Sequence, residues 1–175
     1  MVKKIKFVLI GCGSIARKHA AAISRLREGE IVGAYDKNYQ AAKTFGGEFS
    51  VPVFSDVDAM METAEPDVIN ILTPSGCHCD NIIDLARFEK HFIVEKPLAL
   101  NLQQIDGILE QCNKKGLKVF VVQQNRFNPP IVKLKQALDK ERFGKLVMGT
   151  VRVRWCRKQE YFDEVSWRGT KAMDG

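Results

Sequence analysis

Residues 5–16 read Ile5-Lys-Phe-Val-Leu-Ile-Gly11-Cys-Gly13-Ser-Ile-Ala16. The apolar run at the start of this stretch predicts a short buried strand. The pattern Gly11-x-Gly13-x-x-Ala16 follows directly, and an amphipathic segment comes after it. The stretch therefore predicts a strand, a tight glycine turn and a helix in immediate succession.

The residue types in this turn suit the binding of a dinucleotide. Gly11 allows a sharp turn off the strand, and Gly13 has no side chain to keep a phosphate from the backbone. Ala16 is small enough for the helix to pack closely on the sheet. Ser14 and Ile15 begin that helix, whose free N–H groups and positive dipole end favour a pyrophosphate.

An acidic residue stands at the expected distance downstream. Residues 31–35 predict a second strand, which ends at Asp36, where a carboxylate accepts hydrogen bonds from the adenosine ribose. A carboxylate there repels the 2′-phosphate of NADP, so we expect NAD as the cofactor. Lys37 follows directly and leaves NADP as an alternative. The other reading is a structural glycine turn in a nucleotide-free domain, with Asp36 as a solvated strand end.

Length and composition indicate a globular protein with one complete core and part of a second. The chain has 175 residues, 45% hydrophobic and 27% charged. We expect no membrane segment, because no apolar run approaches the roughly 20 residues that span a bilayer. The N-terminal residues 1–4 lead into the strand without a small-residue cleavage site, so we expect no signal peptide. Five cysteines at irregular spacing indicate reduced thiols and a cytoplasmic protein.

Two further features of the sequence concern metal ions and nucleic acids as ligands. Cys77-His78-Cys79 has no second ligand pair elsewhere, so we expect no metal site. The net charge of +6 is spread without an arginine-rich tail, which favours a nucleotide or an acidic sugar over nucleic acid as partner.

Strand and helix patterns alternate six times along the first 124 residues. Further strands are expected at residues 51–54, 67–72, 91–94 and 118–122. A helix is expected at residues 39–45, ending at Gly46-Gly47, and another after a Ser55 cap. Helices are also expected from Cys77 or His78, and from an Asn101 cap to Gly116. This order predicts an α/β fold, a doubly wound parallel Rossmann sheet, with its polar clusters at the carboxyl ends of the strands.

A second domain is expected to begin near residue 125. Asn128-Pro129-Pro130 predicts a helix start, and residues 146–157 alternate like a strand with one covered face. Arg152 and Arg154 share the opposite face, which is either a solvated or interface face or part of an anion site. We therefore expect a NAD-binding Rossmann domain at 1–124 and the incomplete start of an α+β substrate and oligomerisation domain at 125–175.

Three motifs together resemble one enzyme family. Gly11-Cys-Gly-Ser-Ile-Ala16, Thr73-Pro74 with His78, and above all Glu95-Lys96-Pro97 resemble the glucose–fructose oxidoreductase / inositol dehydrogenase family (Gfo/Idh/MocA). Within it, residues 121–130 and 154–170 resemble the bacterial UDP-N-acetyl-2-amino-2-deoxyglucuronate dehydrogenases. These enzymes oxidise the C3 hydroxyl of the sugar with NAD, in the synthesis of surface polysaccharide such as lipopolysaccharide O-antigen.

The resemblance implies roles for particular residues. It places Lys96 beside both the nicotinamide and the reacting hydroxyl, as the catalytic and a substrate-binding residue, and Glu95 at the nicotinamide ribose. Asn125 and Arg126 are implied to bind substrate. Ser75 stands where much of the family has asparagine. The further residues implied to line the cofactor are Thr73, Pro74, Ser75, His78, Gln124, Trp167 and Arg168.

The resemblance also implies a longer protein. Family members continue for about another domain, which carries a catalytic histidine and most of the substrate-binding sheet. We therefore expect this chain alone to bind NAD weakly or not at all and to be inactive on the sugar. We also expect a homo-oligomer, a dimer or tetramer, because many of the enzymes that the chain resembles are tetramers. An unpaired strand edge in residues 145–175 favours the same association. A dehydrogenase of inositol or another polyol, and a non-catalytic NAD-binding module, stay open as alternatives.

Overall fold

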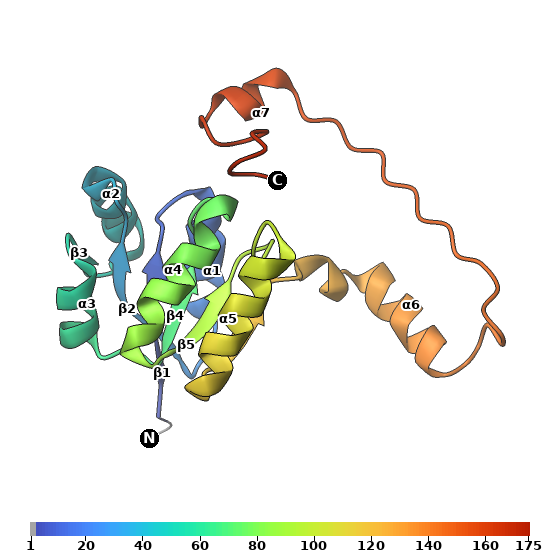
Figure 1. Cartoon of the computed structure of the whole chain (residues 1–175), viewed down its shortest axis with the longest axis horizontal. Coiled ribbons are helices and arrows are strands. Elements are labelled where there is room, and N and C mark those ends of the chain that lie inside the picture. The colour runs from blue at the N-terminus through green and yellow to red at the C-terminus, as the bar shows by residue number, and fades with distance from the viewer. Residues whose placement is uncertain (1–2) are drawn as a thin grey trace. The chain divides into compact units, whose positions relative to one another are not determined.

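A parallel sheet of six strands organises the first part of the chain (Figure 1). The structure is a computed structural model that describes residues 3–175. Met1 and Val2 lie outside the described residues. They belong to the N-terminal segment for which we expect no signal peptide. The strands are β1 Ile5–Ile10, β2 Gly29–Tyr35, β3 Val53–Phe54, β4 Val68–Ile71, β5 His91–Val94 and β6 Val119–Val121. Their order is β3-β2-β1-β4-β5-β6, with every neighbouring pair parallel. This order confirms the predicted doubly wound Rossmann fold.

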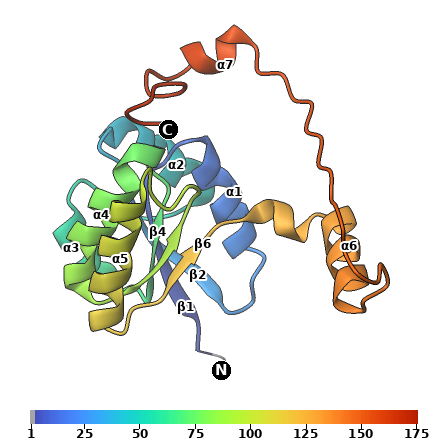
Figure 2. The same cartoon turned by 45° about the vertical axis from the view of Figure 1, so that its right-hand side comes forward.

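Helices cover both faces of the sheet, which explains the continuous apolar runs in its central strands. They are α1 Ser14–Ile23, α2 Tyr39–Phe49, α3 Val57–Ala64, α4 His78–Leu85 and α5 Leu102–Lys114. Val8 of β1 belongs to the core formed with Met60 of α3, Ile82 of α4 and Ile108 of α5. The next residue, Leu9, points to the opposite face and the core of α1 and α2. Figure 2 shows α3, α4 and α5 together on one side of the sheet.

The predicted end of α2 at Gly46-Gly47 is wrong. The helix continues through both glycines to Phe49, and Ser50 ends it in the left-handed conformation, with φ of 54°. Gly46 is needed for close packing: a Cβ there would lie 2.5 Å from Cγ1 of Val53 and 2.8 Å from the carbonyl oxygen of Val51. The glycine that suggested a helix end thus serves the contact between α2 and β3.

The predicted cap of α3 is displaced by one residue. Asp56, not Ser55, is the N-cap, and its Oδ1 accepts a hydrogen bond from the backbone N–H of Ala59 at 2.8 Å. A carboxylate at this position satisfies a free amide and also suits the helix dipole. Asp58 adds a second negative charge in the first turn.

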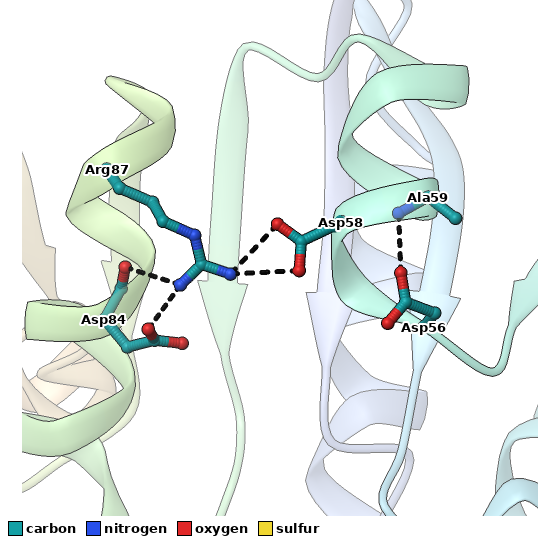
Figure 3. A network of polar contacts seen from close by, with 5 residues as sticks. All are labelled: Asp56, Asp58, Ala59, Asp84 and Arg87. Carbon is teal, nitrogen blue, oxygen red and sulfur yellow. Dashed lines mark hydrogen bonds and ion pairs between the residues drawn. The ribbon is translucent and has the colours of Figure 1, made fainter.

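Asp58 also takes part in a bridge between neighbouring helices (Figure 3). Arg87, in the short helical turn Ala86–Phe88 after α4, donates from Nη2 to both carboxylate oxygens of Asp58, each at 3.1 Å. Its Nη1 contacts the carboxylate of Asp84 and donates to the Asp84 carbonyl at 3.1 Å. Hydrogen bonding to Asp58 raises the pKa of Arg87, so the guanidinium stays charged as it links α3 to α4.

The described residues divide into two compact units. One comprises residues 3–122 with Gly169–Gly175, and the other is Gln123–Arg168. The second contains the helical turn Gln124–Phe127, α6 Pro129–Asp139 and α7 Gln159–Asp163. Asn128 is the N-cap of α6, as predicted, with proline in the first turn. The assignment of residues 125–175 to a substrate domain stays a prediction.

The strand expected at residues 146–157 is not formed. Among the described residues this segment pairs with no neighbour, and its apolar side chains are in solvent, with Val147 91% and Val151 90% exposed. A strand depends on hydrogen bonds to a second strand, which alternation in one segment does not supply. Arg152 and Arg154 are likewise exposed.

Across residues 3–175, no helix combines the length and the apolar character needed to cross a lipid bilayer.

Replacing each of the two glycines of the first turn by alanine is expected to affect stability differently. We expect Gly11→Ala to lower the free energy of unfolding by about 2 kcal/mol or more, because φ is +99° and the new Cβ would lie 2.8 Å from the carbonyl carbon and oxygen of Leu72. Gly13→Ala is the matched control, since φ is −73° and a Cβ meets no atom within 4 Å. Urea unfolding followed by circular dichroism measures both. Equal stabilities of the two variants would contradict the close approach at Gly11.

Candidate functional site

The turn between β1 and α1 has the geometry of a phosphate-binding loop. Gly11 passes so close to Leu72 and Thr73 that only a residue without a Cβ fits. Gly13 is exposed and its Cβ position faces open space, so a phosphate has access to the backbone. No side chain caps α1 at Gly13, and the amides of Ser14 and Ile15 open the helix. These residues fit the pyrophosphate of a dinucleotide.

Asp36 stands next to this turn at the end of β2. Its Oδ2 accepts a hydrogen bond from the backbone N–H of Cys12 at 2.8 Å, and its Oδ1 accepts one from Asn38 at 2.8 Å. Burial, together with the charge of Asp36, raises the pKa of the Cys12 thiol to about 12, so this thiol is not a nucleophile. The carboxylate thus lies where it was predicted, bonded to the turn, and its remaining lone pairs are available to a ribose hydroxyl.

The loop after β4 is held by His78 at the start of α4. His78 is 1% exposed, and its Nδ1 and Nε2 lie 2.7 Å from the carbonyl oxygen of Pro97 and 2.8 Å from that of Thr73. Thr73 also donates from Oγ1 to Asn81 at 2.7 Å, and Ser75 is buried. Both ring nitrogens of His78 contact backbone carbonyls, so the residue connects the loop after β4 to the loop after β5. Its predicted contact with the cofactor is untested.

Glu95 and Lys96 follow the end of β5, one buried and the other exposed. The Lys96-Pro97 peptide bond is cis. Glu95 Oε1 lies 3.0 Å from His19 Nε2, and Oε2 accepts a hydrogen bond from the Lys96 amide at 3.2 Å. Burial acts to raise the pKa of Glu95, but the hydrogen bond and charge of His19, with those of Lys96, outweigh it and hold the pKa below its usual value. Glu95 is therefore a carboxylate at neutral pH.

The fold brings the predicted residues of the first unit to one edge of the sheet. Gly11, Asp36, Thr73 and Glu95 each follow directly, or within two residues, the carboxyl end of a neighbouring strand. In a doubly wound sheet this edge is where ligands bind.

The other predicted site residues lie in the second unit and are described within it. Gln124, Asn125 and Arg126 are exposed in a helical turn. Arg168 donates to the Tyr161 carbonyl at 2.8 Å, pairs with Glu164 and lies over the Tyr161 ring at 4.1 Å, all within its own unit. The roles predicted for these residues and for its neighbour Trp167 remain predictions.

Two residues of the site were missed in the sequence. His19 was interpreted as a packing residue of the first helix, and Asn70 as part of a buried strand. The structure places Asn70 Nδ2 3.3 Å from His19 Nδ1 and completes a chain of contacts from Asn70 through His19 to Glu95. The available signal was the amide of Asn70 inside the apolar run 68–72, because a buried polar side chain requires a partner.

Cys77, His78 and Cys79 do not bring their side chains together in the structure. Among residues 3–175, no three His, Cys, Asp or Glu side chains are grouped as a metal ion would require. Cys79 is buried, and burial raises the pKa of its thiol.

Comparison with known proteins places this site in a family. Residues 5–123 match the family model described as "Oxidoreductase family, NAD-binding Rossmann fold" (Gfo/Idh/MocA). Inositol 2-dehydrogenase of Rhizobium meliloti is 30% identical over 147 residues, 84% of this chain and 44% of that enzyme. UDP-N-acetylglucosamine 3-dehydrogenase of Acidithiobacillus ferrooxidans is 30% identical over 74% of this chain and 40% of its own length.

A solved structure matches nearly the whole chain. The WlbA dehydrogenase of Bordetella pertussis, crystallised with NADH and UDP-GlcNAcA, is 35% identical with a TM-score of 0.93, and the match covers 99% of this chain and 53% of that one. The present chain thus spans about half the length of the proteins that it matches. It belongs to the Gfo/Idh/MocA oxidoreductase family, and its first part is a NAD-binding Rossmann domain.

Proposed function

We propose that the chain is the NAD-binding part of a dehydrogenase that oxidises the C3 hydroxyl of a UDP-N-acetylhexosaminuronic acid. The observation that carries the proposal is the extent of the likeness to the WlbA dehydrogenase, a protein solved with NADH and UDP-GlcNAcA. That likeness covers 99% of the chain with a TM-score of 0.93, whereas the likeness to the solved scyllo-inositol dehydrogenase of Lactobacillus casei covers 82% with a TM-score of 0.75. The likeness to the WlbA dehydrogenase takes in residues 123–168, where the predicted substrate residues Asn125 and Arg126 lie.

The distribution of charge supports an anionic substrate. Residues 123–168 contain eleven Lys and Arg but five Asp and Glu, so this unit carries the entire net charge of +6. The excess of positive charge is therefore concentrated in residues 123–168 and not scattered along the chain. A nucleotide-sugar acid brings a diphosphate and a carboxylate, which a basic surface attracts, whereas inositol is neutral.

Different residues of the first unit bind the cofactor and assist the oxidation of the hydroxyl. Gly13 and the amides of Ser14 and Ile15 hold the pyrophosphate, and Asp36 accepts hydrogen bonds from the adenosine ribose. When bound, NAD accepts a hydride from the carbon that carries the hydroxyl. Lys96, exposed at the end of β5, polarises that hydroxyl and stabilises the negative charge as its proton leaves. Glu95 binds the nicotinamide ribose.

The cysteines bear on the location of the enzyme. All five are free, as in a reducing compartment, which supports a cytoplasmic location. A role in surface-polysaccharide synthesis is what the resemblance to the bacterial UDP-N-acetyl-2-amino-2-deoxyglucuronate dehydrogenases implies. Exposed apolar side chains such as Val147, Val151 and Trp155 support burial of residues 146–155 in a homo-oligomer or in a larger chain.

Inositol oxidation is the second candidate, because the Rhizobium meliloti inositol enzyme is 30% identical to this chain. A turnover assay distinguishes oxidation of the nucleotide-sugar acid from oxidation of inositol. The assay uses the protein purified from its source cells, at the length at which those cells make it. With NAD, we expect reduction to NADH with UDP-GlcNAcA and none with myo-inositol or with UDP-GlcNAc, which lacks the carboxylate. Turnover of inositol alone would contradict the proposal, and NAD binding without any turnover would favour the non-catalytic module.

The phosphate contact is tested on the chain as it stands. We expect NADH to bind weakly and measurably by calorimetry, and Gly13→Val to weaken binding about tenfold or more, because the new side chain fills the space that a phosphate needs. Gly47→Val is the matched control, since its Cβ position on α2 is also open and lies away from the turn. Equal loss of affinity in both variants would contradict a phosphate at Gly13.

Asp36 is expected to select NAD over NADP. Asp36→Asn keeps an oxygen acceptor for the amide of Cys12 but removes the charge that repels a 2′-phosphate. We expect the ratio of NADPH to NADH affinity to rise about tenfold, which corresponds to about 1.4 kcal/mol. Competition binding with the two reduced cofactors measures the ratio. An unchanged ratio would mean that Asp36 serves only to hold the glycine turn.

A further inference from the structure

A chain of polar contacts lies behind the exposed Lys96. Asn70 Nδ2, on β4, lies 3.3 Å from His19 Nδ1, on α1, and His19 Nε2 lies 3.0 Å from Glu95 Oε1. Glu95 Oε2 accepts the hydrogen bond from the Lys96 amide. Asn70 is fully buried, and the side chains of His19 and Glu95 are 13% and 12% exposed. Three elements far apart in the sequence thus converge on one carboxylate.

Glu95 is an ionised carboxylate that can only accept, so Nε2 of His19 carries a proton at their contact. When the amide of Asn70 donates to Nδ1, His19 must hold its proton on Nε2 and donates it to Glu95. When the amide is turned, its oxygen accepts from Nδ1–H, and His19 then carries protons on both nitrogens. In both arrangements His19 offers an N–H group to Glu95.

The structure places Asn70 Nδ2 toward His19 and leaves Asn70 Oδ1 buried without a hydrogen-bond partner among the described residues. Turning the amide would bring Oδ1 to His19 but would leave two N–H donors in that buried position instead of one acceptor. The amide of Asn70 therefore donates to Nδ1 of His19, and Nε2 of His19 donates to Glu95.

Glu95 is fixed at both of its oxygens as a result. Oε1 faces His19 and Oε2 binds the backbone of Lys96, so the plane of the carboxylate is defined. The side chain of Lys96 begins at the same residue whose amide Glu95 holds. Loss of the His19 contact at Oε1 therefore frees the Glu95 carboxylate to rotate, which alters the hydrogen bond of Oε2 with the Lys96 amide.

We propose that His19, oriented by Asn70, is a positioning residue that fixes the Glu95 carboxylate and thereby sets the backbone of Lys96 at the cofactor site. This inference rests on the proposed function for the role of Lys96. The contact of His19 with Glu95 is independent of that role and is measured separately.

The direct test follows the amide proton of Lys96 by two-dimensional NMR as the pH is lowered. This proton reports the ionisation of Glu95, because Glu95 Oε2 is its acceptor. The charges acting on Glu95 are those of His19 and Lys96, and both lower its pKa. We expect His19→Leu to raise the pKa of Glu95, so the Lys96 amide changes at higher pH than in the wild type.

Three further variants separate positioning from packing. His19→Gln keeps a side-chain N–H donor but not the charge, and it is expected to bring the titration part of the way back toward the wild type. His91→Leu is the matched control: its Nδ1 accepts from the Lys118 amide at 3.2 Å at the start of β5, and it should leave the Lys96 amide unchanged. Should His19→Leu not fold, His19→Asn takes its place, since its side chain is too short to reach Glu95. An unaltered Lys96 titration in a folded His19 variant that has lost the donor would overturn the inference.

Turnover gives the second readout. In the active protein, His19→Leu is expected to lower kcat/KM about tenfold, as for the loss of one hydrogen bond to a charged group, and His19→Gln to recover it. A shifted Lys96 titration with full turnover would overturn the link from His19 to Lys96. Failure of the wild type to bind NADH would instead refute the proposed function and leave the titration as the test of His19.

Discussion

The close approach of Gly11 to the backbone of Leu72 and Thr73 is the constraint on which the site depends. β1 lies between β2 and β4, so the chain leaving it must turn within van der Waals contact of the end of β4. Only a residue with a positive φ and no Cβ fits there. The same turn directs α1 back onto the sheet, where Ala16 and Ala20 are fully buried. The Cys12 amide, which Asp36 binds, and His19, which contacts Glu95, owe their positions to this turn.

Buried polar contacts then connect the loops at the carboxyl edge of the sheet. His78 joins the loop after β4 to the loop after β5 through the carbonyls of Thr73 and Pro97. His19 joins α1 to the end of β5 through Glu95. Because such groups are costly to bury without partners, each contact restricts its loops to one arrangement. The exposed Lys96 and Gly13 are thus held by a rigid layer beneath them.

Much of the fold was predictable because its signals are local. Each strand of the sheet coincides with an apolar run that ends in polar residues, and the Asn101 cap of α5 was correctly predicted. The errors share one cause. Gly46 looked like a helix end and Ser55 like a cap, but the contact of α2 with Val53 and the stronger acceptor of Asp56 decided otherwise. Residues 146–157 have the alternation of a strand, but within residues 3–175 no neighbouring strand pairs with them.

By itself, the sequence determined the doubly wound order, the glycine turn and the acid at the end of β2. These features depend on the spacing of residues along the chain. Because the carboxyl ends of parallel strands lie at one edge of the sheet, the spacing also predicts which edge carries the site. Only the tertiary structure decided that His19, Asn70 and Glu95 meet, because they lie on three separate elements and their sequence separations are 51 and 76 residues. It also decided that His78 faces two carbonyls. Side-chain hydrogen bonds between distant elements depend on packing geometry, which no local pattern encodes.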